Sequence, residues 1–394
     1  MQPVTHRDSR TGTSQSGSPF GSTLPGPAIR PTRVEVSLAD VCANAWSLAT
    51  LAGTKVFAVV KADAYGHGAV PVAKALAASG AVYGFGVSLI EEGIELREAG
   101  IELPILVMGP SMAGGEEAVL LHGLWPMLST LDAVRAMVEA AQKAKQSLTV
   151  HLKLDTGMGR LGLDRKDFAS ALALIGGGPL QLGGVSTHFA CADGDDPDDP
   201  RSLTRTQLER FEAWVADAGI GAEVMRHVAN SSATIRFPET RLDAVRPGLS
   251  LYGAGATAGD GRFLVTTRFV SAITQLRTAD VGDSVSYGAL WTASRPSKLA
   301  VVPVGYADGL PRSLTGRAQA LVGGVRVPVV GTISMDITVL DVTGLPEARV
   351  GAEVVFLGAQ GDEEITIPEF AGRAGISEYE VTCGISKRVP REYR

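Results

Sequence analysis

The sequence predicts an α/β protein in which a (β/α)8 barrel of the TIM type precedes a mostly-β domain. From residue 33 to about 260, short apolar runs typical of strands alternate with helical patterns. The pattern repeats about eight times, which favours a barrel over an open doubly wound sheet, the remaining alternative. The apolar runs show little alternation with polar residues, as expected for parallel strands buried on both faces.

Each predicted strand of the barrel is followed by a predicted helix. VFAVV (56–60) precedes a helix starting near Ala69, and VYGFGVS (82–88) precedes a helix over 90–100. The later pairs are ILVM (105–108) with 116–121, LTVHLKL (148–154) with 166–175, LGGVSTHF (182–189) with 203–219, and EVMRHVA (223–229) with a short helix. This part of the chain closes around LSLYG (249–253).

Beyond residue 262 the character of the sequence changes. FLVTTRFVSAITQL, SKLAVVPVGYA, RAQALVGGVRVPVVG, DITVLDV and AEVVFLG are strand-like runs separated by Gly, Pro and Asp turns. Few helical patterns lie between them, which indicates a second, mostly-β domain. We therefore expect a barrel over 33–262 and a C-terminal β domain over 263–394.

The composition of the chain indicates which kinds of partner and which cellular location to expect. Residues 1–32 are rich in Ser, Thr, Gly and Pro, which predicts a disordered tail, and they lack the apolar centre of a signal peptide. No apolar stretch reaches the roughly 20 residues that span a bilayer. The net charge of −6, without a basic run, argues against nucleic acid or membrane as the main partner. Three widely separated cysteines favour a reducing cytoplasm over a disulfide framework or zinc site.

The acidic segment DGDDPDDP (193–200) suggests a calcium loop at first sight. It lacks the spaced ligands and the distal glutamate of an EF-hand loop. We interpret it as a solvated acidic loop, and no metal site is predicted.

The segment AVVKADAYGHG (58–68) places a lysine directly after an apolar strand. Lys61 is therefore expected at the C-terminal rim of the barrel, where active sites are built. Partial burial there lowers the pKa of a lysine and favours an amine that forms a Schiff base. A surface lysine is the ordinary alternative. The neighbouring aromatic Tyr65 and the flexible turn after it suit a flat cofactor, so from these residues alone both interpretations stay open.

The same segment resembles the cofactor-lysine motif of the bacterial alanine racemase family. Members of that family are pyridoxal-phosphate (PLP) enzymes of fold type III. Further segments resemble the family in the same order: HLKLDTGMGRLG, RHVANSSAT, VRPGLSLYG, SVSYGALWTA, VPVGYADGLPR, VGTISMDI and SEYEVTCGISKRVPR. The resemblance runs from about residue 33 to the end and covers both predicted domains. It implies interconversion of L- and D-alanine, a supply of D-alanine for peptidoglycan, and a homodimer with active sites shared between the chains.

The resemblance also assigns the cofactor-binding residues. It implies that the phosphate is held by Ser231, the backbone at Gly248 and Leu249, and Tyr379, with Tyr65 and Asn230 nearby. A strand-to-helix turn at Asn230-Ser231 offers backbone N–H groups and a hydroxyl to an anion. An ordinary helix N-cap is the simpler interpretation of Asn-Ser, and the two are compatible.

Arg246, by resemblance, points at the pyridine nitrogen of PLP. Arginine is effectively always protonated, so it cannot give that nitrogen a proton. The ring then withdraws electrons less strongly, which suits racemisation and suppresses transamination. An ordinary ion-paired arginine is the alternative without the neighbouring motifs.

Racemisation requires a base on each face of the reacting carbon. By resemblance these are Lys61 on one face and Tyr287 on the other, with His188 contacting the tyrosine. A free phenol has a pKa of about 10, so Tyr287 needs such help near neutral pH. A core histidine bonded to backbone is the simpler interpretation of His188, whereas the Ser-Tyr-Gly context of Tyr287 indicates an exposed turn.

The resemblance places the substrate carboxylate on Arg160 and the backbone at Met335. Tyr306 and Asp336 shape the pocket. Lys153 matches a lysine that is carbamylated in many family members, and an anionic carbamate would pair with Arg160. An unmodified Lys153 facing Asp155 is the alternative.

Other functions on the same fold are a broader-specificity amino-acid racemase, an amino-acid decarboxylase, and a non-catalytic PLP-binding barrel protein. The β domain that carries Tyr287 argues against the last, since such proteins end at the barrel. The SYGALWTA and Arg246 motifs argue against a decarboxylase. The size of the substrate pocket cannot be derived from sequence, so the broader-specificity racemase stays open.

Overall fold

The computed structural model describes residues 29–110, 114–255 and 262–394. Most of the predicted N-terminal tail, residues 1–28, lies outside the described residues. Within the described ranges, no helix is long and apolar enough to cross a membrane. The same ranges contain no group of His, Cys, Asp and Glu side chains that could hold a metal ion.

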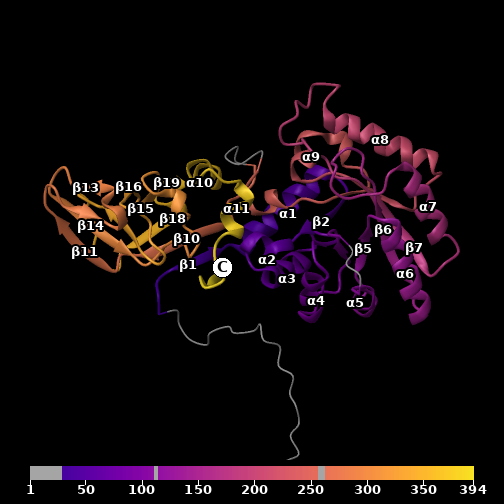
Figure 1. The fold of residues 1–394 in the computed structure, drawn as a ribbon, viewed down its shortest axis with the longest axis horizontal. Helices are drawn as coiled ribbons and strands as arrows, with labels where there is room; N and C mark the ends of the chain where they lie inside the picture. The colour runs from indigo at the N-terminus through magenta and orange to yellow at the C-terminus, as the bar shows by residue number, and fades with distance from the viewer. Residues whose placement is uncertain (1–28, 111–113, 256–261) are drawn as a thin grey trace, which may run out of the picture. The chain divides into compact units, whose positions relative to one another are not determined.

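Eight parallel strands form the barrel wall (Figure 1). They are β2 (Lys55–Val59), β3 (Gly84–Val87), β4 (Ile105–Val107), β5 (Trp125–Leu128), β6 (Leu148–Lys153), β7 (Leu180–Ser186), β8 (Met225–His227) and β9 (Ala244–Val245). They pair side by side in the order β9-β2-β3-β4-β5-β6-β7-β8. The ring closes between β8 and β9, where Asp243 N–H donates to Arg226 O at 3.1 Å and Arg246 N–H to Ala229 O at 2.9 Å. The predicted barrel is confirmed.

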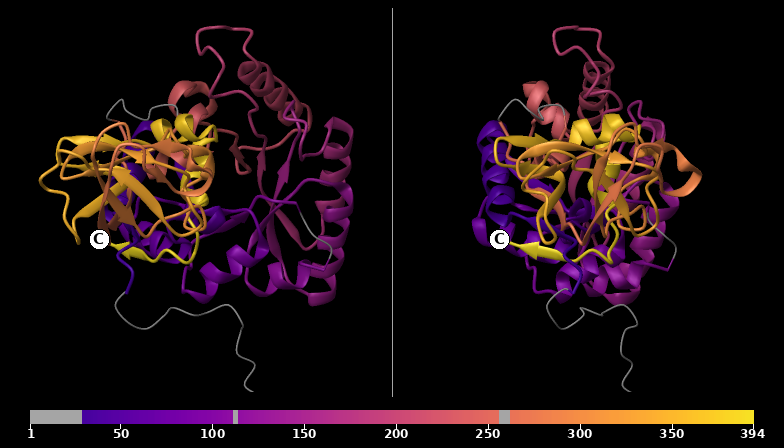
Figure 2. Two further views of the ribbon diagram at one scale, coloured as in Figure 1. Left: turned by 60° about the vertical axis from the view of Figure 1, so that its left-hand side comes forward. Right: turned by 90° about the vertical axis from the view of Figure 1, so that its left-hand side faces the viewer.

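Helices lie outside the strands of the barrel (Figure 2). They are α1 (Leu38–Ala52), α3 (Ala69–Ser79), α4 (Ile90–Glu98), α5 (Glu116–Leu121), α6 (Leu131–Ala144), α7 (Arg165–Ile175), α8 (Leu203–Asp217) and the short α9 (Ser231–Arg236), with 3-10 turns η1 (Pro238–Thr240) and η2 (Leu249–Tyr252). Four of them, α1, α6, α7 and α8, start after a residue whose side chain accepts a backbone N–H, such as Ser37 before α1 and Thr130 before α6. Their apolar faces cover the strands and complete the core.

The C-terminal mostly-β domain is also confirmed. Its strands are β10 (Thr267–Ala272), β11 (Gln275–Ala279), β12 (Ser284–Val285), β13 (Trp291–Thr292), β14 (Ser297–Val302), β15 (Gln319–Val322), β16 (Val325–Val330), β17 (Thr338–Asp341), β18 (Glu353–Gln360), β19 (Glu363–Ile365) and β20 (Arg391–Tyr393). Its helical segments are η3 (Tyr287–Ala289), η4 (Arg312–Leu314), α10 (Ile367–Ala374) and α11 (Glu378–Cys383). The main sheet has the order β11-β14-β17-β16-β15-β18-β10-β1-β20.

The first strand of the described chain belongs to this C-terminal sheet. β1 (Arg33–Val36) runs antiparallel to β10 and parallel to β20, although it precedes the barrel in sequence (Figure 1). The polypeptide therefore leaves the sheet, builds the barrel, and returns to the same sheet. Strands from the two ends of the chain lie side by side in it.

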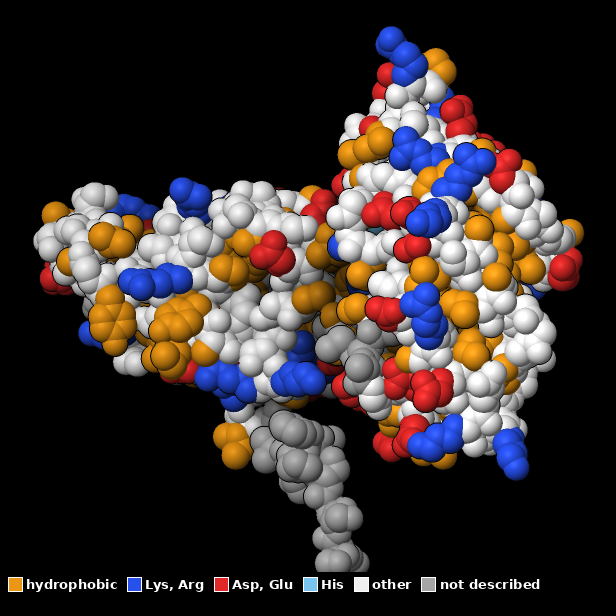
Figure 3. All heavy atoms as spheres, turned by 45° about the vertical axis from the view of Figure 1, so that its right-hand side comes forward, with side chains coloured by type: hydrophobic (Ala, Val, Ile, Leu, Met, Phe, Trp, Pro, Cys, Tyr) orange, Lys and Arg blue, Asp and Glu red, His pale blue; other side chains and the backbone are white. Residues whose placement is uncertain are grey.

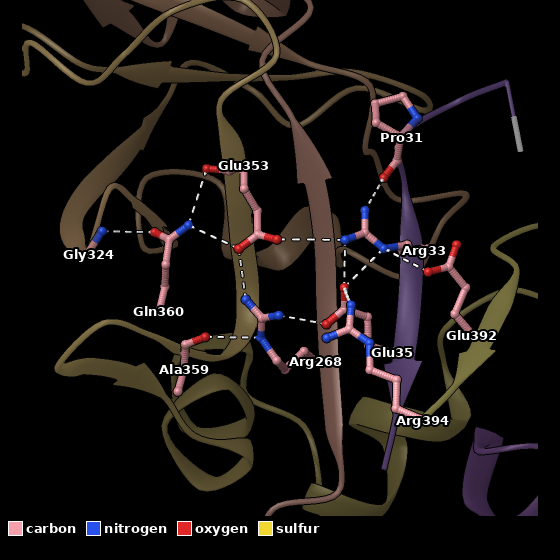
Figure 4. Close-up of polar contacts among 10 residues, drawn as sticks. All are labelled: Pro31, Arg33, Glu35, Arg268, Gly324, Glu353, Ala359, Gln360, Glu392 and Arg394. Atoms are coloured by element: carbon pink, nitrogen blue, oxygen red, sulfur yellow. Dashed lines mark hydrogen bonds and ion pairs between the residues drawn. The ribbon is translucent and has the colours of Figure 1, made fainter.

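A buried carboxylate holds these strands together (Figure 4). Glu35 is only 4% exposed and is contacted at 2.6 Å by each of Arg33, Arg268 and Arg394. Arg268 also pairs with Glu353 at 2.8 Å. Burial alone would raise the pKa of Glu35, but hydrogen bonds and charge from Arg33 and Arg268 lower it overall. These five residues, here called the Glu35 cluster, link β1, β10, β18 and the C-terminal residue.

Charges of both signs are mixed on the one face of the molecule that Figure 3 draws. On the face drawn in Figure 3, acidic and basic side chains are interspersed over the barrel, with no large area of one sign. That distribution agrees with the small net charge of −6. This face therefore lacks the basic stripe typical of nucleic-acid binding.

Candidate active site

A cavity of about 410 Å³ opens where the barrel strands end. This size is typical of small-molecule sites. Every barrel strand contributes to its lining at or just after its C-terminal end, and α11 adds Tyr379 from the β domain. The lining residues are Val59, Lys61, Tyr65, Ser88, Met108, Gly109, Pro110, Met127, Lys153, Arg160, Leu161, His188, Asn230, Ser231, Arg246, Gly248, Leu249 and Tyr379.

Most of the site residues expected from sequence therefore meet in one place. Eleven of the residues named above as candidates line this cavity: Lys61, Tyr65, Lys153, Arg160, His188, Asn230, Ser231, Arg246, Gly248, Leu249 and Tyr379. They are spread over more than 300 positions of sequence. Sequence reasoning missed Ser88 after β3, the lining residues after β4 and Met127 in β5, although their places near the C-terminal ends of barrel strands are a usable signal.

Lys61 follows β2 and begins α2 (Lys61–Gly66), a turn with an unusual hand. Burial lowers the pKa of Lys61, and the positive charge of Arg160 lowers it further, against the opposing effects of Glu92 and Cys383. Residues 62–65 all have φ between 52° and 55°, so the turn winds left-handed without a glycine among them. Such a conformation costs roughly 1–2 kcal/mol per residue. The sequence predicted only a flexible turn here.

The end of the cavity near α9 is built from backbone and hydroxyl groups. Asn230 caps α9, since its Oδ1 accepts from Ala233 N–H at 2.9 Å. Ser231 Oγ accepts from Gly248 N–H at 2.9 Å and Ser250 N–H at 3.3 Å. A Cβ at position 248 would lie 2.4 Å from Tyr65 Oη, so a side chain there would push the buried Tyr65 ring aside.

Arg246 is buried beneath the cavity and held from several sides. Its Nη2 donates to Thr187 O at 2.8 Å, and its Nη1 donates to His227 Nδ1 at 2.8 Å and also contacts His227 O. His227 Nε2 in turn shares a hydrogen bond of 2.7 Å with His151 Nδ1. Burial lowers the pKa of Arg246 to about 10, so the guanidinium is charged at neutral pH.

The supporting pair His151 and His227 was not predicted as part of the site. Because Arg246 donates to His227 Nδ1, a neutral His227 carries its proton on Nε2 and donates to His151. Burial and the charge of Arg246 lower the pKa of both imidazoles, that of His151 to about 3. Both rings therefore stay neutral and fix the orientation of the arginine.

Two cations and a histidine lie near one another at the ends of β6 and β7. Burial and the positive charges of Arg246 and Arg160 lower the pKa of Lys153 to about 8. Burial and the positive charges of Arg246 and its neighbours Lys153 and Arg160 lower the pKa of His188 to about 3. The loop that carries Arg160 is shaped by Asp155, whose Oδ1 accepts from Gly157 and Gly159 N–H at 3.0 Å.

The remaining candidates lie apart from this cavity. Tyr287, Tyr306, Met335 and Asp336 line a second hollow of about 1240 Å³ in the β domain. Tyr287 is 73% exposed, as the sequence predicted for a turn residue. Its carbonyl accepts from Thr332 Oγ1 at 2.6 Å, and Asp336 pairs with Arg388 at 2.7 Å. Within one chain, Tyr287 and His188 line different cavities.

Together, the eight-stranded barrel, the lysine of lowered pKa that lines its cavity and the mostly-β domain define a class of two-domain barrel proteins. Comparison with known proteins gives the family. Residues 36–256 match the family model of the alanine racemase N-terminal domain, and residues 266–393 match that of the C-terminal domain. The chain belongs to the alanine racemase family.

Individual alanine racemases are similar to this chain over nearly its whole length. The alanine racemase of Sorangium cellulosum is 44% identical over 93% of this chain and 100% of its own length. The crystal structure of alanine racemase from D-cycloserine-producing Streptomyces lavendulae has a TM-score of 0.87 at 35% identity, covering 93% of this chain and 97% of that one. The Bartonella henselae enzyme, solved with covalently bound pyridoxal phosphate, has a TM-score of 0.84 at 27% identity, covering 92% and 99%.

Proposed function

We propose that this chain is a PLP-dependent alanine racemase that moves the α-proton of alanine from one face of the carbon to the other. The observation that carries the proposal is the placement of Lys61, an amine of lowered pKa, at the rim of a cavity. Family membership supports the substrate, and the product D-alanine would enter peptidoglycan. The action on a cytoplasmic amino acid fits the reducing location inferred from the cysteines.

The residues of the cavity fit PLP. An aldehyde needs an amine, and Lys61 provides one. A phosphate needs hydroxyl and N–H donors, which the hydroxyls of Ser231 and Tyr379 and the backbone N–H of Leu249 would provide, while Gly248 N–H donates to Ser231 Oγ and orients it. The absence of a Cβ at Gly248 leaves room for the close packing of Tyr65. Bound there, the cofactor supplies the electron withdrawal that makes the α-proton of alanine acidic.

Arg246 moderates that electron withdrawal. Its guanidinium stays protonated near neutral pH and has no proton to give. His227 and the carbonyl of Thr187 hold it in place. Beside a bound cofactor, the protonated Arg246 would leave the ring nitrogen without a proton, and this would favour the fast return of a proton to carbon that racemisation requires.

Two bases then act on opposite faces. Lys61 Nζ takes or returns the proton on one face because burial and Arg160 favour its neutral form. Tyr287 Oη serves the other face. His188, kept neutral by its surroundings, can accept a hydrogen bond and so orient this phenol. Arg160 and the backbone at Met335 bind the substrate carboxylate, and Tyr306 and Asp336 bound the pocket.

The assignment of Tyr287 requires a second chain. Tyr287 and Lys61 line different cavities of one chain, so a head-to-tail homodimer is needed to bring them together. The lining of the β-domain hollow exposes Tyr287, Tyr306, Met335 and Ile337. Exposed apolar side chains gathered in this way are typical of an interaction surface. In a two-fold dimer, each β domain covers the partner's barrel and both contacts repeat.

The first test combines covalent trapping with a substrate panel. Borohydride treatment of the PLP-loaded protein should attach the cofactor to the peptide that contains Lys61, as detected by mass spectrometry. Racemisation should be fastest with alanine among small amino acids. Loss of the trapped peptide in Lys61→Ala is expected. Trapping elsewhere, or faster turnover of a larger amino acid, would overturn the cofactor or the substrate assignment respectively.

A further inference from the structure

The backbone directly after Lys61 adopts a conformation that must be stabilised by its surroundings. Ala62, Asp63, Ala64 and Tyr65 have φ of 52–55° and ψ of 38–50°, and none of them is glycine. In this region the Cβ of an L-residue crowds the following carbonyl oxygen. Strained conformations persist only where neighbouring structure fixes them, and they cluster at functional sites.

Glu92 contacts the start of this left-handed turn. The side chain of Glu92 lies in the first turn of α4, and its Oε1 accepts from Ala62 N–H at 2.6 Å. Its Oε2 accepts from Ser88 N–H at 2.7 Å and Leu89 N–H at 3.0 Å. One carboxylate thus joins the residue after Lys61 to the loop after β3, whose Ser88 also lines the cavity.

Other groups hold the far end of the turn. Asp63 Oδ1 accepts from Ala69 N–H at 2.8 Å, and Arg391 Nε donates to Gly66 O at 3.0 Å. The ring of His67 contacts Ala64 O at 3.0 Å. The start beside Lys61 is held by Glu92.

We propose that Glu92 is a positioning residue for Lys61. By accepting from Ala62 N–H, it fixes the start of the left-handed turn. One turn of a helix brings residues four apart to the same side, so Lys61 and Tyr65 both reach the cavity. This inference rests on the proposed role of Lys61 as the cofactor-bonding amine.

The charge of Glu92 supports the same arrangement. Lys61 is surrounded by Arg160, Lys153, His188, Cys383 and Glu92. Burial and Arg160 lower the pKa of Lys61, and Glu92 counteracts them. A neutral residue at position 92 should therefore lower the pKa of Lys61 further. A residue that only stabilised α4 would leave that pKa unchanged.

The test compares Glu92→Gln with Glu91→Gln, a matched control one residue earlier on the same helix. Glutamine has one acceptor oxygen where the carboxylate uses two. Loss of a hydrogen bond to a charged group should weaken PLP binding about tenfold. Trapping of PLP on Lys61 at limiting cofactor should fall accordingly. In the cofactor-free protein, competitive acetylation should report a lower pKa for Lys61. Glu91→Gln should match the wild type in both.

A second variant keeps the test interpretable if Glu92→Gln folds poorly. Ala62→Gly removes the steric cost of the left-handed start, because glycine adopts positive φ freely. The double variant should therefore recover melting temperature lost in Glu92→Gln, and it offers a folded chain for the two Lys61 measurements. Unchanged trapping and unchanged Lys61 pKa in the Glu92 variants would overturn the proposal. Failure of the wild type itself to trap PLP on Lys61 would overturn the proposed function instead.

Discussion

At the scale of single residues, the chemistry of the site follows from burial and from which charges face each other. Lys61, Lys153 and Arg246 bring three basic groups around one cavity, and all three have lowered pKa values. Lys61 could be predicted from its place directly after an apolar strand, and Lys153 and Arg246 could be predicted from resemblance to the family. The left-handed turn after Lys61 could not, because alanine has no preference for that conformation. Its partner Glu92 lies 30 positions away.

Lys153 offers a prediction at this scale. Its pKa of about 8 leaves a substantial neutral fraction near neutral pH, and only a neutral amine adds carbon dioxide. The resulting carbamate would replace repulsion of Arg160 and Arg246 by attraction. Intact-mass spectrometry under bicarbonate should therefore show one added CO2, and Lys153→Gln should remove it. Carbamylation should increase as pH rises through 8.

Two controls decide this prediction. Lys143→Gln removes an exposed lysine of α6 and should leave the added mass unchanged. An adduct that survives Lys153→Gln, or a wild type that gains no mass in bicarbonate, would leave Lys153 as the unmodified lysine facing Asp155.

At the scale of elements, the strands and helices with a clear hydrophobic pattern were predicted correctly. The helix predicted to start near Ala69 and that predicted over 116–121 are confirmed as α3 and α5. β9 was missed because two residues carry no pattern, and β5 because Pro126 interrupts it. The pairing of β1 with β10 and β20 joins segments more than 200 residues apart, and no local signal encodes it.

The Glu35 cluster tests whether that long-range pairing depends on a buried charge. Glu35→Gln leaves Arg33, Arg268 and Arg394 without their shared carboxylate, which should cost about 3 kcal/mol of unfolding free energy. Glu392→Gln removes a carboxylate that is about half exposed and paired with Arg33 at 3.1 Å, so it should cost less than about 1 kcal/mol. Urea unfolding at one fixed protein concentration measures both. Equal losses would contradict a special role for Glu35.

The pH dependence of this difference has a defined sign. The folded-state pKa of Glu35 is lowered, so its stabilisation is fully present above the unfolded-state pKa of about 4.3. The stabilisation is lost as pH falls through the folded-state value. The gap between wild type and Glu35→Gln should therefore be constant near neutral pH and shrink in acid. A gap that widened in acid would mean that Glu35 is protonated in the native protein.

At the scale of the whole molecule, the candidate site residues of one chain lie in two separate cavities. The barrel cavity holds Lys61, Arg160 and Arg246, and the β-domain hollow holds Tyr287 and Met335. The sequence predicted every one of these residues through resemblance to the family. The separation of these two groups of residues within one chain could not be predicted, because it depends on how the barrel packs against the β sheet. Under the proposed two-base mechanism, reaction at both faces of the substrate would require residues from two chains.

The mixing of two inactive variants measures this most directly. Chains with Lys61→Ala and chains with Tyr287→Phe are combined in equal amounts, dissociated mildly and allowed to reassociate, with hybrid dimers counted by native mass spectrometry. Random pairing makes about half the dimers hybrid, and each hybrid holds one intact site and one doubly altered site. About a quarter of wild-type racemase activity should return. A mixture that contains hybrids yet is no more active than its parents would contradict sites shared between the chains.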